Sequence, residues 1–252
     1  MIRGAYAFGD GDVPARRLGL LASVFEASSR RFLAVHGVVR PRLALDLGCG
    51  PGHTTRLVAA TLRPRRTLGL DASPDFVARA AAGARAGAPP RVEFAVHDVA
   101  RRPFPTAAGP PELVYARLLV AHLEEPEAAI AAWSAQLAPA GRLLMEEVEA
   151  IETEHPVLAE YLARVVERLD RAGQRMVAGP LLARVADAGA VATVEPPVAH
   201  AAAMFRMNLD TWCDDEAVHG RLAPALDGLL EDPRTGVITW RVRQAVVESS
   251  RR

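Results

Sequence analysis

The sequence predicts an α/β fold in which a mostly parallel sheet is covered by helices on both faces. From residue 42 to about residue 150, short apolar runs alternate with stretches of helical character. This alternation is typical of parallel sheets, because each strand needs a crossover, usually a helix, to reach the next. The chain has 252 residues, of which 50% are hydrophobic, and this is enough for one large domain with insertions.

The N-terminal part is expected to be helical. Between residues 12 and 37, apolar side chains recur near a 3.6-residue period and arginines occupy the other side. This pattern predicts an amphipathic helix, and a break near Ser28 is compatible with it. The apolar positions are Leu18, Leu21, Phe25, Phe32 and Leu33.

The repeating region contains five apolar runs that we interpret as strands. Ser73 can cap the helix after the second strand, and Pro74 suits the first position of that helix. Strands are expected at residues 42–48, 66–71, 91–98, 112–117 and 141–149, and helices at residues 53–62, 73–87 and 125–138.

The pattern changes after the fifth strand. A further helix is predicted at residues 156–173, before the next helix of the repeat at residues 179–189. An insertion at this point would lie above the carboxyl edge of the sheet, where open α/β folds bind ligands. We therefore interpret residues 152–176 as a lid over the substrate. The remainder is expected to form a strand at residues 190–199, a helical insertion at about residues 203–232 and a closing strand at residues 236–249.

Composition excludes several classes of partner. Thirty basic and thirty acidic residues cancel, so the basic footprint of a nucleic-acid binder is absent. All thirty basic residues are Arg, which excludes Schiff-base catalysis and Lys-containing phosphate loops. Cys49 and Cys213 make neither a disulfide framework nor a zinc site, and no 18-residue apolar run appears. We expect a cytoplasmic monomer or homodimer that binds a small molecule and neither metal, nucleic acid nor membrane.

A glycine turn follows the first strand in the stretch "LALDLGCGPGHTTRL". Gly48, Gly50 and Gly52 come directly after Asp46, so the turn can pass close to a ligand with no Cβ atoms in the way. The helix that begins near His53 would direct its free amides at that ligand. A triphosphate is disfavoured because the Lys of a phosphate loop is missing, and the spacing also differs from G-x-G-x-x-G.

Two further acids follow the next strands. Asp71 ends the second strand, at roughly the ~20-residue distance at which an acid meets ribose hydroxyls. NAD and other adenosine ligands both remain open on that observation. Asp98 closes the third strand, where an acid suits an exocyclic amine. Together with Asp46, these acids favour a ligand with a ribose, an adenine and a cationic end over one with a pyrophosphate.

Five motifs resemble those of the class I S-adenosylmethionine (SAM)-dependent methyltransferases. They are "LDLGCGPG", "GLDAS", "HDV", "LVYARLLVAHLEEP" and "LAPAGRLLMEEVE". The stretches "YAFGD", "ARRLGLL" and "ARLLVAH" are similar to those of bacterial small-molecule, natural-product methyltransferases. The resemblance extends to about residue 190. It implies a Rossmann-like seven-stranded sheet, mostly parallel with the last strand antiparallel, and SAM as cofactor with S-adenosylhomocysteine as product.

The resemblance also implies residue roles. Asp71 would take the ribose, while Tyr6 and Arg17 would close over the methionine carboxylate. The chain would divide into an N-terminal helical cap over the cofactor, residues 1–40, and a SAM-binding core, residues 41–252. Glu112 departs from the Asp that starts the fourth strand in many relatives. The implied cofactor-binding residues are Asp46, Gly48, Gly50, Gly52, Asp71, Ala72, Asp98, Val99 and Arg17.

Four residues are candidates for catalysis: His122, Arg117, Tyr6 and Glu147. Positioning of nucleophile and methyl group provides most of the rate of an in-line displacement, and a base adds to it where the acceptor must lose a proton. His122 is the leading base, or else a helix-entry residue bonded to backbone. Arg117 would hold an oxyanion or a substrate carboxylate, or else pair with a neighbouring acid. Glu147 would lie near the substrate mouth, or else be solvated or paired with Arg; Tyr6 could instead be an amphipathic anchor.

The preferred function is methyl transfer to a carbon, oxygen or nitrogen of a small, largely apolar natural product, with an aromatic body favoured. A cyclase or rearrangement enzyme that keeps the fold and SAM is the first alternative. A nicotinamide-dependent oxidoreductase is a weaker one, and neutral charge disfavours RNA or protein substrates. The acids at residues 214–216 are expected to begin a helix, and Phe205 and Met207 are candidates for an apolar pocket wall.

Overall fold

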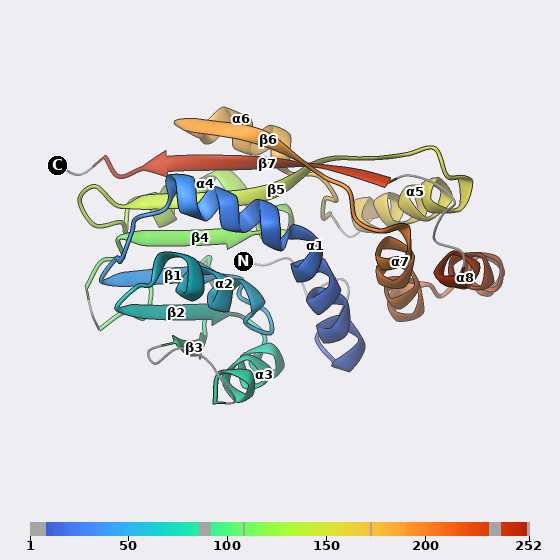
Figure 1. The fold of residues 1–252 in the computed structure, drawn as a ribbon, viewed down its shortest axis with the longest axis horizontal. Helices are drawn as coiled ribbons and strands as arrows, with labels where there is room; N and C mark the ends of the chain where they lie inside the picture. Colours follow the sequence, from blue (N-terminus) through green and yellow to red (C-terminus); the bar gives the residue numbers. More distant parts are fainter. Residues whose placement is uncertain (1–8, 86–91, 108, 172, 232–237, 251–252) are drawn as a thin grey trace.

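One seven-stranded sheet forms the centre of the molecule (Figure 1). The computed structural model describes residues 9–85, 92–107, 109–171, 173–231 and 238–250. The strand order is β3-β2-β1-β4-β5-β7-β6, and β7 is antiparallel to both of its neighbours. This confirms the predicted sheet, mostly parallel with the last strand antiparallel. The strands are β1 (Leu43–Leu47), β2 (Arg66–Asp71), β3 (Val92–Val96), β4 (Leu113–Arg117), β5 (Arg142–Thr153), β6 (Ala188–Val194) and β7 (Ile238–Glu248).

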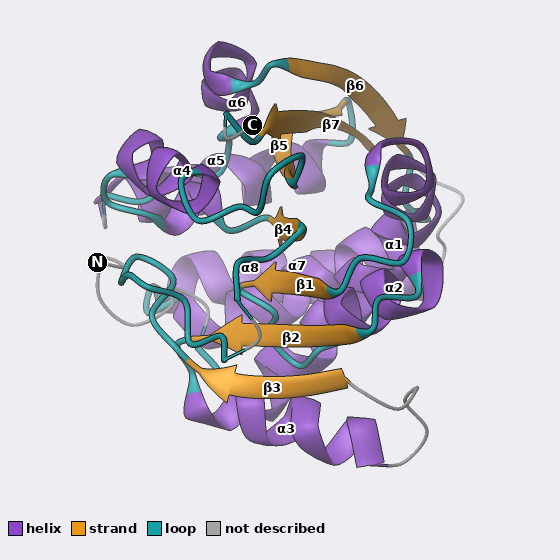
Figure 2. Cartoon of the chain, turned by 90° about the vertical axis from the view of Figure 1, so that its left-hand side faces the viewer, coloured by secondary structure: helices purple, strands orange, loops and turns teal. Residues whose placement is uncertain are grey.

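Helices cover both faces of this sheet (Figure 2). Helices α1 and α2 lie on one side, and α4 and α6 lie on the other. The helices are α1 (Asp12–His36), α2 (His53–Leu62), α3 (Pro74–Arg85), α4 (Pro126–Ser134), α5 (Pro156–Arg171), α6 (Gly179–Val185), α7 (Val198–Trp212) and α8 (Glu216–Glu231), with a short 3₁₀ helix, η1 (Val120–His122), after β4.

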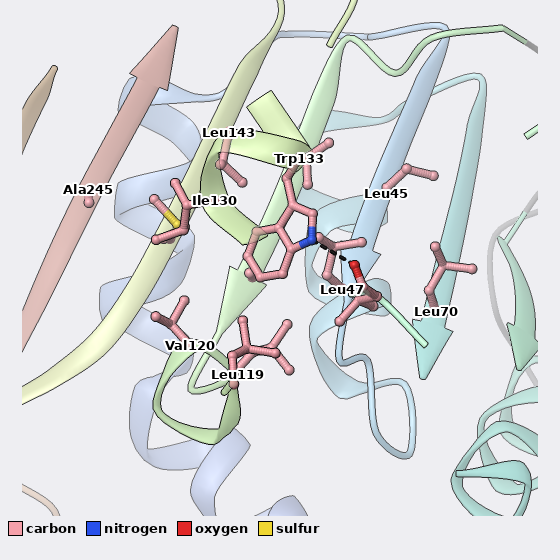
Figure 3. Packing of buried hydrophobic residues seen from close by; sticks show 14 of the residues in the cluster. Leu45, Leu47, Leu70, Leu119, Val120, Ile130, Trp133, Leu143 and Ala245 are labelled. Carbon is pink, nitrogen blue, oxygen red and sulfur yellow. Dashed lines mark hydrogen bonds between the residues drawn. The ribbon is translucent and has the colours of Figure 1, made fainter. Parts of the chain in front are cut away.

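The central strands are apolar throughout because both of their faces are covered. In β1, Leu43, Leu45 and Leu47 belong to the core under α4 and α6, whereas Ala44 belongs to the core under α1 and α2. Trp133 of α4 is fully buried in the first of these cores. Its Nε1 donates a 2.8 Å hydrogen bond to the carbonyl of Val99 (Figure 3). Helix α4 therefore fixes the loop that follows β3.

A second helical group stands beyond the carboxyl ends of β4 and β5 (Figure 1). Helices α5, α7 and α8 share a hydrophobic core with α1 and with the far ends of β5 and β7. Tyr161 of α5 stacks on Phe205 of α7 with ring centroids 4.2 Å apart, and Phe25 of α1 packs on Trp240 of β7 at 5.3 Å. Helices α5, α7 and α8 thus stand next to the carboxyl ends of the strands, where the glycine turn also lies.

The structure differs from the predicted elements in four places. Helix α1 is continuous and shows no break near Ser28, whose Oγ accepts a 3.2 Å hydrogen bond from Gln244 of β7. The helix expected to reach residue 189 ends at Val185, because Ala188 already pairs with β7. The strand expected at 190–199 therefore begins and ends earlier, and α7 begins at Val198. The helical stretch expected at about 203–232 is two helices.

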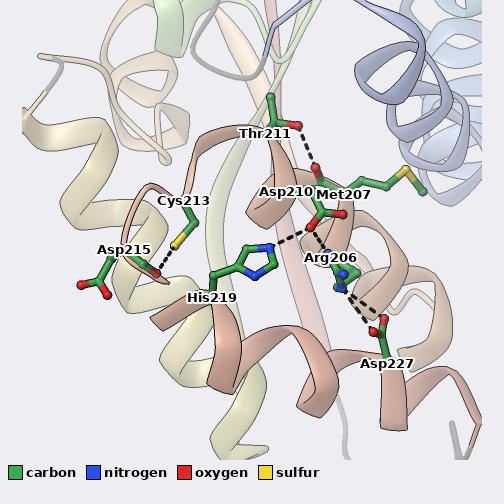
Figure 4. A network of polar contacts seen from close by, with 8 residues as sticks. All are labelled: Arg206, Met207, Asp210, Thr211, Cys213, Asp215, His219 and Asp227. Atoms are coloured by element: carbon green, nitrogen blue, oxygen red, sulfur yellow. Dashed lines mark hydrogen bonds and ion pairs between the residues drawn. The ribbon is translucent and has the colours of Figure 1, made fainter. Parts of the chain in front are cut away.

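A polar network ties α7 to α8 (Figure 4). Arg206 pairs with Asp210 and, at 3.2 Å, with Asp227, while His219 Nε2 lies 2.9 Å from Asp210. Asp215 accepts the backbone N–H groups of residues 217 and 218, so the acidic stretch does begin a helix as predicted. Across the described residues, no group of three potential ligands could hold a metal, and no helix has the length and apolarity to span a membrane.

Candidate active site

The glycine turn after β1 is strained for any other residue. Gly48, Gly50 and Gly52 have φ values of 64°, 50° and 82°, in the left-handed region that only glycine adopts readily. A Cβ on Gly48 would lie 2.8 Å from Leu119, and one on Gly52 would lie 2.8 Å from Phe94. A Cβ is therefore closely opposed at two of the three glycines, whereas at Gly50 it would make only an ordinary contact with Leu18, at 3.5 Å.

Asp46 lies behind this turn, outside the wall of the cavity described below. Its Oδ2 accepts 2.6 Å hydrogen bonds from the hydroxyls of Thr54 and Thr55, in the first turn of α2. Burial raises the pKa of Asp46 to about 6, against the lowering effect of these hydrogen bonds. The acid that the sequence assigned to the cofactor thus ties α2 to β1.

Asp71 supports the turn from the neighbouring strand. Its Oδ2 accepts the N–H of Gly50 at 2.8 Å, and its Oδ1 accepts the N–H of Ser73 at 2.9 Å. Burial raises the pKa of Asp71. The Ser73 hydroxyl in turn donates to Asp10 at 2.8 Å. Asp71 and the glycine turn are therefore one hydrogen-bonded unit, to which Asp10, just before α1, is attached.

A cavity of about 450 Å³ lies at this edge of the sheet. The glycine turn and Asp71 form part of its wall, together with Asp10, Ala72 and Val99. Asp98 is not in the wall: its Oδ1 accepts the N–H of Ala100, and it pairs with Arg101 at 3.6 Å. The remaining wall comes from α1, η1, the ends of β4 and β5, and the second helical group; it includes Arg17, Leu21, Arg117, His122, Glu147, Leu169, Arg175, Met176, Met204, Phe205, Asn208 and Trp240.

His122 and Glu147 are coupled through η1. Glu147 Oε1 accepts the N–H groups of Leu119 and Val120 at 2.7 and 2.6 Å, which are free donors at the start of η1. Burial raises the pKa of Glu147 to about 8. His122 ends η1, hydrogen-bonds the Gln174 side chain, and has its pKa lowered by burial to about 4. Glu147 therefore positions the segment that carries His122, whose imidazole is neutral at pH 7.

Arg117 ends β4 in the cavity wall. Its guanidinium donates to Ser29 Oγ at 3.2 Å and lies 5.7 Å from the centroid of the Phe25 ring. No ion pair between described residues includes Arg117, although its positive charge favours the ionised form of the buried Asp46. The acid two residues beyond Glu147, Glu149, instead forms a bidentate pair with Arg243.

Comparison with known proteins agrees with the resemblance in the motifs. Residues 44–141 match the family model described as a methyltransferase domain. A trans-aconitate 2-methyltransferase from Methylobacterium radiotolerans is 32% identical over 190 residues, 73% of this chain and 64% of that protein. The matched region of the chain is similar to the class I SAM-dependent methyltransferases. A second trans-aconitate 2-methyltransferase, from Streptomyces avermitilis, is 37% identical over 108 residues, 42% of this chain and 39% of that protein. The chain thus spans less than two thirds of these relatives.

Solved structures agree on the methyltransferase fold. A putative methyltransferase from Bacillus halodurans superposes with a TM-score of 0.59 at 14% identity, covering 87% of this chain and 97% of that one. The [4+2]-cyclase SpnF superposes with a TM-score of 0.54 at 19% identity, covering 90% and 92%. At such identities the likeness concerns the fold alone.

The cavity wall contains residues that the sequence did not indicate. Asn208 and Trp240 line the cavity and are 7% and 4% exposed. Phe205 was expected in an apolar wall and is there, but Met204 replaces the expected Met207 as its neighbour in that wall. Helical phase of α7 would have indicated Asn208, one turn after Phe205, whereas no pattern marked Trp240. Tyr6 lies outside the described residues.

Proposed function

We propose that this methyltransferase transfers the methyl group of SAM to a small molecule bound in the 450 Å³ cavity. The observation that carries the proposal is that one cavity joins the glycine turn and Asp71 to a mostly apolar wall holding His122 and Arg117. When bound, SAM supplies a methyl group on a sulfonium, which a nucleophile takes by in-line displacement. A turn without phosphate-binding Lys suits this ligand, because it carries its own positive charge.

The cavity residues suit the parts of the cofactor. We assign Gly48 and Gly50 to the methionine portion, since these two of the three glycines line the cavity. Asp71 is assigned to the ribose hydroxyls and Val99 to the adenine. Arg17 is buried in the wall and is assigned to the methionine carboxylate. For Asp46 we propose support of the turn in place of direct contact, because its carboxylate bonds inward.

The part of the cavity away from the glycine turn, which we assign to the substrate, suits a small molecule with an apolar body. Leu21, Leu169, Met176, Met204 and Phe205 line it, and an aromatic natural product would fit such walls. The relatives' name states that they methylate trans-aconitate, and this remains the alternative substrate. Helix α5, within the predicted lid at 152–176, contributes Leu169 to the wall, which supports a covering role.

The described residues can position the substrate, and the base that they offer, His122, is a weak one. Gln174 holds the His122 ring, and Glu147 holds η1 beneath it. With a pKa of about 4, His122 can accept a proton only from an acidic acceptor group, so positioning must provide most of the rate. Arg117 is assigned to a negatively charged oxygen of the substrate.

Methyl-labelled SAM provides the test. A small product that carries the label, formed by a protein that binds SAM in the micromolar range, is the expected result. Product without label would instead favour the cyclase, and absence of SAM binding would overturn the proposal. We further propose a cytoplasmic monomer or homodimer without a nucleic-acid partner, which gel filtration and salt-dependent RNA binding can test.

A further inference from the structure

One part of the cavity wall is made of hydrogen-bond donors that the protein leaves unused. Trp240 of β7 is 4% exposed, and its Nε1 has no hydrogen-bond partner among the described residues. Most buried N–H groups in proteins are paired, so this unpaired indole N–H, on a residue that lines the cavity, is a candidate donor to a ligand.

Arg117 and Trp240 both pack against the ring of Phe25. Phe25 packs against Trp240 with centroids 5.3 Å apart, and the Arg117 guanidinium lies 5.7 Å from the Phe25 centroid. A guanidinium has five N–H donors and no acceptor, and among described residues only the Ser29 hydroxyl takes one of them. Trp240 and Arg117 thus both line the cavity and both pack against Phe25. The polar atoms of these two side chains are donors and not acceptors. The group that satisfies both must be an acceptor.

The charges of the side chains in the cavity wall indicate which kind of acceptor suits Arg117 and Trp240. Asp10 and Asp71 are joined through Ser73 at the glycine turn, in the part assigned to the cofactor. Burial keeps Glu147 largely protonated at neutral pH, and His122 is neutral. The substrate part therefore has a positive excess even after Arg17 is assigned to the cofactor carboxylate. The charged side chains in the cavity wall are Arg17, Arg117, Arg175, Asp10, Asp71 and Glu147.

We propose that the substrate is an amphiphilic carboxylate, whose carboxylate accepts from the Arg117 guanidinium and the Trp240 indole N–H. Its apolar body packs on Met176, Met204 and Phe205. The inference rests on the proposed function and specifies the substrate class of that site. A neutral amide or alcohol would leave the half-buried Arg117 guanidinium without an anion at ion-pair distance among the described residues, which is costly.

Matched acid–amide pairs test this class. The protein is first saturated with S-adenosylhomocysteine and then titrated calorimetrically with 4-phenylbutyrate, 4-phenylbutanamide, octanoate and octanamide. We expect each acid to bind at least tenfold more tightly than its amide. Equal affinities within both pairs, or no binding of either acid while the cofactor product binds, would overturn the proposal. Failure of the protein to bind S-adenosylhomocysteine would instead count against the proposed function.

Variants of Arg117 and Trp240 test where the substrate carboxylate binds. Arg117→Gln is expected to weaken binding of the acids at least tenfold and to leave amide binding and cofactor affinity unchanged; Trp240→Phe is expected to give a smaller, threefold to tenfold loss. Arg241→Gln is the matched control, because Arg241 follows Trp240, is half exposed and does not line the cavity. An equal loss in Arg241→Gln, or none in Arg117→Gln, contradicts the assignment. If Arg117→Gln does not fold, the wild-type acid-to-amide ratio still decides.

Discussion

The two parts of the cavity wall are built differently. At the glycine turn, the polar groups bond to one another: Asp71 accepts the N–H groups of Gly50 and Ser73, and Ser73 donates to Asp10. In the substrate part, Trp240 Nε1 and Asn208 Oδ1 are buried without partners among the described residues. The polar groups of the first part are satisfied within the protein, whereas the second part holds unpaired polar atoms that we propose a ligand completes. This difference suits an invariant cofactor beside a variable substrate.

The largest expected effect tests the rigidity of the glycine turn. Gly52→Ala would place a Cβ 2.8 Å from Phe94 at a residue with φ of 82°. Left-handed backbone and overpacking together should lower the free energy of unfolding by about 2–5 kcal/mol. Urea denaturation measures it.

Gly50→Ala is the control for this substitution. It shares the left-handed φ but meets only Leu18, at 3.5 Å, so a smaller loss of about 1–2 kcal/mol is expected. Equal losses in the two variants would show that packing at Phe94 does not constrain the turn.

The sequence predicted the glycine turn well because the turn is local. A strand, an acid and alternate glycines are contiguous in the chain, and His53–Leu62 and Arg66–Asp71 were predicted with the bounds that the structure has. The role of each residue in this turn was harder to predict from the sequence. Asp46 bonds to Thr54 and Thr55, eight and nine residues further on, a contact that spacing alone does not distinguish from a ligand contact.

The substrate part was largely beyond prediction because it is assembled from distant segments. Trp240 meets Phe25 across more than two hundred residues of sequence, and an apolar alternation in β7 does not reveal which side chain borders a cavity. In α7 the expected Met207 lies outside the wall while Met204 lies within it, although residues three apart share one face of a helix. Tertiary packing, absent from any local pattern, decides these positions.

The next largest effect tests the contribution of Asp71 to cofactor binding. Asp71→Ala removes the acceptor of two backbone N–H groups and the proposed ribose contact, each a hydrogen bond to a charged group. SAM affinity should fall by about tenfold to a hundredfold, which corresponds to roughly 1.5–3 kcal/mol. Calorimetric titration measures it. Asp75→Ala, which removes an exposed acid of α3, is the control and should bind SAM as the wild type does.

An intermediate effect concerns pH and the segment that joins the two parts of the wall. Burial raises the folded-state pKa of Glu147 to about 8, above its ordinary value of 4.5. The folded protein therefore binds more protons than the unfolded chain between these values, so this residue's stabilising contribution is complete below about pH 4.5 and declines as pH rises through 8. Glu147→Gln should flatten that decline while keeping an acceptor for Leu119 and Val120.

Urea denaturation at pH 5.5, 7 and 8.5 measures the slope for wild type and variant. Glu152→Gln is the matched control, because Glu152 lies on the same strand and is exposed. If wild type and Glu147→Gln show the same slope, then Glu147 is ionised in the folded protein and the substrate part is less positive than inferred.

The smallest expected effect tests how firmly the start of the chain is held to the glycine turn. Asp10→Ala removes the 2.8 Å hydrogen bond from Ser73 and should weaken SAM binding by at most about tenfold, equivalent to roughly 0.5–1.5 kcal/mol. Asp12→Ala breaks only an ion pair with exposed Arg79 and should change SAM affinity little. Should both variants bind SAM like the wild type, the Asp10 contact would merely follow from the structure of the turn, and the segment before α1 would not contribute to cofactor binding through it.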